Sequence, residues 1–184
     1  MHVVKPGLYV AISIWILQGC SSLTAANYSS PYTKPEVGTM IRLNQELSVQ
    51  TGVRIYLQDG FQKGFRDVAK LEPYCQFYIQ RSSDELRKPF TIRPDTFVVY
   101  EVFRQKDSVA IEGLQVASDG ESEVDHGSSQ RTMSTYMELS SDAQPNVTRL
   151  ICSRWADPAA RYHVSVDEIV ASLGDVAQLI PPGG

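Results

Sequence analysis

The stretch TFVVYEVFR at residues 96–104 is a nearly continuous run of β-branched and aromatic side chains. Such side chains pack well on a pleated sheet surface. An apolar run without polar alternation is typical of a central strand that is covered on both faces. The stretch therefore predicts a β protein built around this strand, in which Glu101 is the exceptional charge.

Segments on both sides of this run alternate apolar and polar residues, as half-buried strands do. The clearest of them are Val53–Gln58, Cys75–Gln80, Thr132–Leu139 and Val147–Ser153, and weaker ones are Gly38–Leu43 and Glu46–Gln50. This pattern predicts a mainly β fold, either a β-sandwich or a partly open barrel.

One helix is expected near the C-terminus. Ser165 and Glu168 have the spacing of a capping box, and Gly174 suits the position that ends a helix. The apolar stripe between them consists of Val166, Ile169, Val170 and Leu173. We expect this stripe to pack on the β core, and a short strand to follow at Val176–Ile180.

The N-terminus carries Lys5 and then an apolar run that ends in Leu17-Gln18-Gly19-Cys20. This run is shorter than the roughly 20 residues of a membrane-spanning helix and fits a secretory signal peptide. The last four residues resemble the lipobox of bacterial lipoproteins, Leu-x-Gly/Ala-Cys. The resemblance implies lipid transfer to the Cys20 sulfur and cleavage before Cys20, with residues 1–19 as the signal peptide. Ser21 in place of Asp implies an address at the periplasmic face of the outer membrane.

The chain contains three cysteines. If Cys20 carries lipid, Cys75 and Cys152 remain as a pair in the oxidising periplasm, where such pairs become disulfides. Both also fall on the expected inward faces of strands. The alternative is two free or catalytic thiols.

Composition divides the exported chain into two parts. Residues 20–36 are rich in Ser, Thr and Pro and predict a flexible tether, with a reach of roughly 50 Å when extended. Residues 37–184 have the length of a single β-rich periplasmic domain. The formal net charge of −4 argues against a nucleic-acid partner.

Aromatic residues concentrate around the expected strands. Tyr56, Tyr78 and Tyr136 are the members that the alternation places outward. On one face they would form a surface for an envelope protein or a glycan. Alternatively, they lie beneath a loop or the helix.

Residues 105–130 are expected to be the least structured part of the domain, with a solvated loop at 119–129 and a further strand at 109–116 left open. The alternating acids of the loop, Asp119, Glu121, Glu123 and Asp125 followed by His126, invite a divalent-metal interpretation, but the spacing of a calcium-binding loop is missing. We favour an acidic hairpin tip and expect neither a metal nor a cofactor.

No motif of a catalytic nucleophile is present in the sequence. His163 stands just before the helix without a ligand pattern and is expected at the surface. A pair of carboxylates among Glu72, Asp95 and Glu101 could still meet in space, which keeps a periplasmic hydrolase open as an alternative.

Further short motifs, Val53-x-Ile55-x-Leu57-Gln58-Asp59-Gly60, Tyr74-Cys75, Ile92-x-Pro94-x-x-Phe97, Leu150-x-Cys152 and Ala171-x-Leu173-Gly174-Asp175, resemble a group of small proteobacterial envelope proteins. The resemblance covers roughly residues 45–180 and implies a compact domain with the Cys75–Cys152 pair. The group has no established activity, so no catalytic residue is carried over.

The sequence thus favours a membrane-anchored periplasmic lipoprotein with a non-enzymatic role in binding or envelope assembly. The outer strand face or the loop at 105–130 would be its contact surface. A purely structural envelope lipoprotein is the third alternative, beside the hydrolase.

Overall fold

The computed structural model describes residues 28–109, 130–156 and 162–183. Cys20, the expected signal peptide, the tether up to residue 27 and the acidic segment at 119–126 lie outside these residues. The described part is mainly β, with one C-terminal helix, as the sequence predicts.

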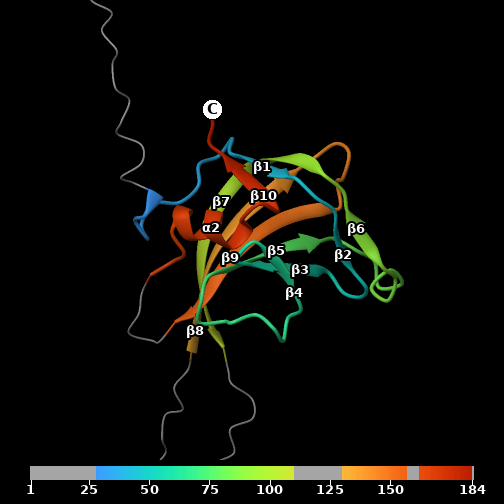
Figure 1. The fold of residues 1–184 in the computed structure, drawn as a ribbon, viewed down its shortest axis with the longest axis horizontal. Helices are drawn as coiled ribbons and strands as arrows, with labels where there is room; N and C mark the ends of the chain where they lie inside the picture. The colour runs from blue at the N-terminus through green and yellow to red at the C-terminus, as the bar shows by residue number, and fades with distance from the viewer. Residues whose placement is uncertain (1–27, 110–129, 157–161, 184) are drawn as a thin grey trace, which may run out of the picture.

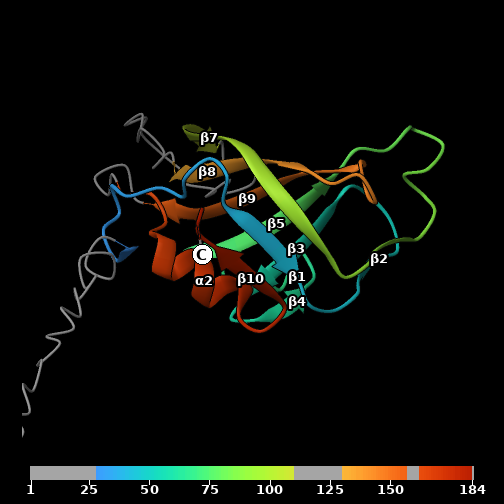
Figure 2. The same ribbon diagram turned by 90° about the horizontal axis from the view of Figure 1, so that it is seen from above.

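The strands form one large antiparallel sheet and one small one. They are β1 (Met40–Leu43), β2 (Leu47–Val49), β3 (Arg54–Gln58), β4 (Phe61–Lys63), β5 (Tyr74–Ile79), β6 (Phe90–Ile92), β7 (Asp95–Val109), β8 (Gln130–Ser140), β9 (Val147–Ala156) and β10 (Ala177–Ile180). The large sheet has the order β10-β1-β7-β8-β9-β5-β3-β4, and β2 pairs with β6. The large sheet curls into a half-barrel (Figures 1 and 2). Of the two expected architectures, the structure is thus the partly open barrel.

Residue alternation sets the two faces of the curled sheet. Ile55, Phe77, Leu150 and Met137 stand directly opposite one another on successive strands, and all four are buried. They point to the concave side, where the main apolar core lies. One sheet curling around its own side chains can therefore bury a core without a second large layer.

The expectation that the strand at 96–104 is covered on both faces is wrong for its outer face. Phe97 and Val99 are fully buried in the core, but Val98 and Tyr100 on the opposite face are 44% and 56% exposed. The reason is that the core fills only the concave side, so this part of β7 has no layer over its outer face. The sequence run therefore resembles a doubly covered strand although only one face is covered.

Helix α2 (Val166–Leu173) lies on the concave side, against β3 and β5. The Ser165 side chain accepts a hydrogen bond from the Glu168 amide, and the Glu168 carboxylate accepts one from the Ser165 amide, which confirms the capping box. Val166, Ile169 and Leu173 are buried, whereas Val170, expected in the same stripe, is 46% exposed.

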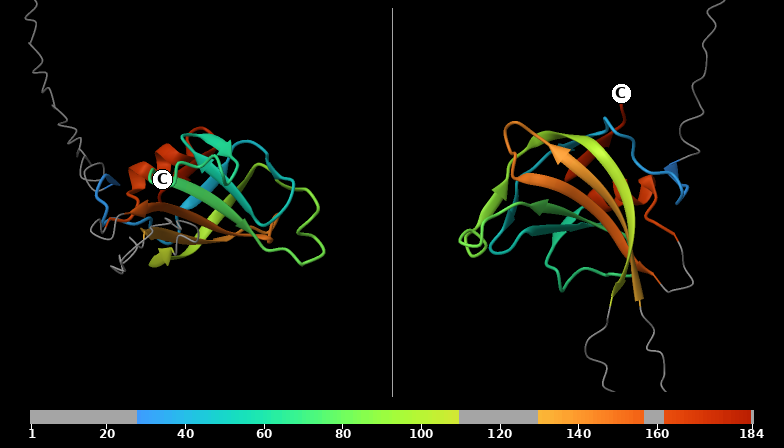
Figure 3. Two further views of the ribbon diagram at one scale, coloured as in Figure 1. Left: turned by 90° about the horizontal axis from the view of Figure 1, so that it is seen from below. Right: turned by 180° about the vertical axis from the view of Figure 1, so that it is seen from behind.

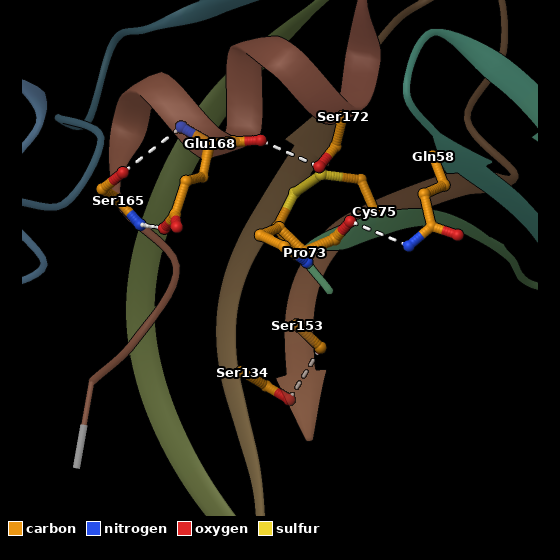
Figure 4. Close-up of a disulfide and its surroundings, with 9 residues drawn as sticks. Gln58, Pro73, Cys75, Ser134, Ser153, Ser165, Glu168 and Ser172 are labelled. Atoms are coloured by element: carbon orange, nitrogen blue, oxygen red, sulfur yellow. Dashed lines mark hydrogen bonds between the residues drawn. A yellow bond between two sulfur atoms is a disulfide. The ribbon is translucent and has the colours of Figure 1, made fainter. Parts of the chain in front are cut away.

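The Cys75–Cys152 disulfide is present, as the sequence predicts. The two cysteines are directly opposite each other on β5 and β9, and both are fully buried. In Figure 4 the helix passes over this bridge, with Ser172 turned toward it. A cross-link between residues 77 positions apart restricts the unfolded chain and stabilises the fold by about 4 kcal/mol.

The C-terminal end of α2 contacts the turn between β3 and β4. The Gly60 amide, in this turn, donates to the Ser172 carbonyl at 3.1 Å. Just after the helix, the Val176 carbonyl accepts a hydrogen bond at 2.9 Å from the amide of Asn44, which lies between β1 and β2. Gly174 has φ +51 and Gly60 has φ +76, a region that favours glycine. A Cβ on Gly174 would lie 2.5 Å from the Gly60 Cα, so this contact needs glycine for space as well as for conformation.

Part of the expected tether lies on the domain. The Arg104 guanidinium donates to the carbonyls of Pro31, Tyr32 and Thr33 at 2.9, 3.1 and 2.7 Å. The Lys34 ammonium donates to the Val102 carbonyl at 3.1 Å. The chain therefore contacts the half-barrel upstream of the domain boundary expected at residue 37.

We predict that Gly174→Ala destabilises the protein by about 3 kcal/mol, because it combines backbone strain with a steric overlap. Gly52→Ala is the matched control: Gly52 also has positive φ, at +90, but nothing lies within 4 Å of its Cβ position. Gly52→Ala should therefore lower the free energy of unfolding only by the backbone strain, about 1 kcal/mol. Urea unfolding of both purified variants measures the difference, and equal losses would contradict the close contact between α2 and the turn.

Candidate binding surface

The outer face of the half-barrel carries the three tyrosines that the alternation places outward. Tyr56 pairs with Gln76, Gln76 with Ile151, and Ile151 with Tyr136, so these residues form one row across β3, β5, β9 and β8. Tyr78 follows Gln76 by two positions and shares its face. The register therefore brings Tyr56, Tyr78 and Tyr136 to the same side of the sheet.

The three tyrosines differ in exposure. Tyr78 and Tyr136 are half-buried, but Tyr56 is only 9% exposed. Tyr56 packs with Val68 and Tyr74 in a small apolar cluster on the outer face, and its ring lies 5.5 Å from that of Phe65. The segment 64–73, which we name the cover segment, thus lies over Tyr56.

Gln58 holds the cover segment in place. Its side-chain amide donates to the Ala69 carbonyl at 3.0 Å and to the Pro73 carbonyl at 3.2 Å, and its oxygen accepts from the Ala69 amide at 3.0 Å. Figure 4 draws the bond to Pro73. Gln58 is 2% exposed, so these bonds replace water that the side chain has lost.

A second aromatic group lies farther along the outer face. Tyr136 stacks on Phe103, its partner on β7, with ring centres 4.8 Å apart and an interplanar angle of 4°. Burial raises the pKa of the Tyr136 phenol, and the charge of Asp107 adds to the rise.

Tyr78 lies beside an ion pair. The Arg149 guanidinium stands 5.9 Å from the Tyr78 ring centre and also binds the Glu138 carboxylate. The outer face thus combines aromatic rings with charges that are already paired, a composition that suits contact with a protein or a glycan.

A groove of about 420 Å³ opens beside Tyr56, between β2 and the β3–β4 hairpin. Its lining combines apolar and aromatic side chains with two cations. The lining residues whose side chains are at least partly exposed include Val49, Phe65, Arg54 and Lys63. Among the described residues, no carboxylate oxygen comes within 4.0 Å of either cation.

The groove lies at the edge of the large sheet. Strand β4 pairs only with β3 and is therefore the last strand of the order. Phe61 on β4 and Phe65 in the cover segment are 66% and 54% exposed. Sequence reasoning noted both phenylalanines among the aromatic residues but did not assign them to a site, because the hairpin that brings them to one edge is a matter of tertiary structure.

The acids considered for catalysis do not gather. Asp95 and Glu101 are six positions apart on β7, about 20 Å along the strand, and Glu72 precedes β5, three strands away in the sheet. Burial would raise the pKa of Asp95, but hydrogen bonds from Ser141, Gln144 and the Thr96 amide outweigh it and hold the pKa below the ordinary value. Asp95 is thus a structural acceptor.

His163 is half-buried and stands just before α2 in the chain. Burial lowers its pKa, and the positive charges of Arg104 and Lys106 lower it further. Across the ranges 28–109, 130–156 and 162–183, no group of three His, Cys, Asp or Glu residues could hold a metal ion.

Comparison with known proteins gives no match: no family model, no curated protein and no solved structure is significantly similar to this chain. Within the described ranges, no helix has both the length and the apolar character needed to cross a bilayer.

We predict that Gln58→Leu loosens the cover segment, because it removes three partly buried hydrogen bonds to the backbone, at about 1 kcal/mol each. Hydrogen exchange of residues 64–73 should become several-fold faster. Gln62→Leu serves as the control, since the Gln62 amide makes one exposed bond, to the Ser48 carbonyl. If both variants left exchange unchanged, Gln58 would not be what holds the segment.

Proposed function

We propose that this chain is a lipid-anchored lipoprotein at the periplasmic face of the outer membrane, and that its half-barrel binds an envelope protein without catalysing a reaction. The observation that carries the anchor is the pairing of cysteines. Cys75 and Cys152 form the disulfide, which leaves Cys20, behind Leu17-Gln18-Gly19, as the third cysteine of the chain.

The disulfide also supports export. Structural disulfides form in oxidising compartments such as the bacterial periplasm and are rare in the cytosol. A buried cross-strand bridge inside the core agrees with the secretory signal that the apolar run before Cys20 resembles.

The binding role rests on the groove and on the strand edge beside it. An edge strand offers unpaired backbone groups to an incoming extended segment, and side-chain pockets next to it select the segment. Arg54 and Lys63 line the groove, whereas the whole chain is acidic, with a formal net charge of −4. An extended, acid-bearing segment of a protein partner fits this combination, with Tyr78 and Tyr136 as further contact area on the same face.

The two alternatives from the sequence have less support. A hydrolase needs reactive groups that converge in a pocket, and Glu72, Asp95 and Glu101 are spread over the sheet. A purely structural lipoprotein would have no use for a groove with two exposed phenylalanines at one edge and two cations that pair with no carboxylate in the part of the chain that the structure describes.

The anchor is tested by Cys20→Ala. We expect this variant to lose palmitate labelling and to move from the membrane fraction to the soluble periplasmic fraction, since the covalent lipid is the only attachment that the proposal invokes. Cys75→Ala with Cys152→Ala is the control and should keep both the label and the membrane fraction. Continued labelling of Cys20→Ala would disprove the anchor.

The binding surface is tested by crosslinking in cells. A photoreactive residue at Phe65 should give a discrete adduct with a protein partner, and Lys63→Glu should reduce that adduct several-fold. Tyr100 is the control position, because its exposure of 56% matches the 54% of Phe65 while it lies on β7. The same adducts from both positions would mean that the groove is not the binding surface.

A further inference from the structure

We propose that the end of the half-barrel bearing Tyr32 and Tyr162 rests on the lipid interface, so that the anchored domain has one fixed face toward the bilayer. The inference depends on the proposed lipid at Cys20 and adds to it a second, noncovalent contact with the same membrane. The occupant of this face is the interfacial zone of a zwitterionic bilayer.

The first support is the place where the tether reaches the domain. Arg104 binds three consecutive backbone carbonyls, those of Pro31, Tyr32 and Thr33, and Lys34 binds the carbonyl of Val102. Several bonds to one short segment fix its direction as well as its position. The chain toward Cys20 therefore leaves from one end of the half-barrel, the end at which α2 begins (Figures 1 and 2).

The second support is the length of chain between lipid and domain. Residues 21–30 separate Cys20 from Pro31, and even fully extended they span about 40 Å. A flexible coil of this length would average about 18 Å. Such a short connection keeps the end of the domain at a high effective concentration near the membrane surface, so a weak contact is enough to hold it there.

The third support is the chemistry of the exposed side chains at this end. Tyr32 is 77% exposed and Tyr162 is 52% exposed, and their rings meet edge to face at 6.3 Å. They come from the two sides of the junction: Tyr32 from the held segment and Tyr162 from the residues before α2. Tyrosine is enriched at membrane–water interfaces, because its ring prefers the apolar side and its hydroxyl the polar side.

The charges that the structure describes beside Tyr162 do not form a basic patch, since the exposed Asp167 lies in the same pocket lining as Tyr162. Arg154 is paired with Glu168, and the Arg104 guanidinium faces three carbonyls. These cations are thus engaged within the protein. We expect binding to this surface to depend little on salt and to need no anionic lipid, unlike the contact of a polybasic patch.

The test uses tryptophan as a depth probe. Trp155 is the single tryptophan beyond the expected signal peptide, so Trp155→Phe gives a silent background. Tyr32→Trp, Tyr162→Trp or Leu86→Trp is then added, and each lipoprotein is reconstituted in phosphatidylcholine vesicles with brominated acyl chains. Leu86 is the control, because the connection between β5 and β6 lies at the opposite end of the long axis (Figure 3).

The brominated lipid should quench Tyr32→Trp and Tyr162→Trp several-fold more than Leu86→Trp, at low and at high salt. Quenching of Tyr32→Trp alone would overturn the inference, because it would place only the held segment near lipid. Equal quenching of all three would overturn it as well. Flotation with the vesicles reports the anchor separately: protein that floats without selective quenching refutes the contact, and protein that does not float refutes the lipid.

Hydrogen exchange provides a measurement without tryptophan variants. The lipidated wild type on vesicles should exchange more slowly at Tyr162 and the first turn of α2 than the unlipidated Cys20→Ala protein in buffer, with no change at 82–88. Identical exchange at both places would also overturn the inference.

Discussion

The packing of α2 into the concave side of the sheet is the constraint on which the rest of the structure depends. An eight-stranded sheet that curls only halfway leaves an open core, and the buried side chains of Ile169 and Leu173 fill that opening. The helix then reaches the β3–β4 turn at Gly60 and Gly174, and the chain continues into β10 at the other edge of the sheet. One short helix thus connects the two ends of the strand order, which is why its cap and its terminal glycine are both specialised.

Short stretches of sequence were sufficient to predict the features that depend only on residues close together in the chain. The capping box at Ser165 and Glu168, the alternation of β3 and β5, and the inward direction of both cysteines follow from short stretches of sequence. The curvature of the sheet could not be predicted in this way. It depends on which strands are neighbours, and β7 resembles a doubly covered strand because Val98 and Tyr100 are apolar although they are exposed. The sequence shows that a side chain is apolar, but whether that side chain is buried depends on which other elements pack over it.

The candidate site illustrates the same division. Alternation was enough to turn Tyr56, Tyr78 and Tyr136 outward, each on its own strand. That they share one face follows from the register of the paired strands, which alternation within single strands does not give. It could not separate the covered Tyr56 from the half-buried other two, because the cover comes from a segment outside the strands that Gln58 holds by three hydrogen bonds. The groove with Arg54 and Lys63 was missed for a related reason: its wall is contributed by β2, whose pairing with β6 belongs to a separate sheet.

The held N-terminal segment links the fold to the proposed location. If the tether were free up to residue 36, the domain could turn in any direction relative to the membrane, and its binding surface would have no preferred side. Arg104 restricts that freedom, because it shortens the free part of the tether and fixes the chain at Pro31, on the end where α2 begins. The small sheet of β2 and β6 and the groove beside β2 lie toward the other end of the long axis. With the proposed lipid at Cys20, the protein would be attached at one end and would carry its groove toward the other, where a partner in the periplasm could reach it. The partly buried Arg104 side chain would set this arrangement.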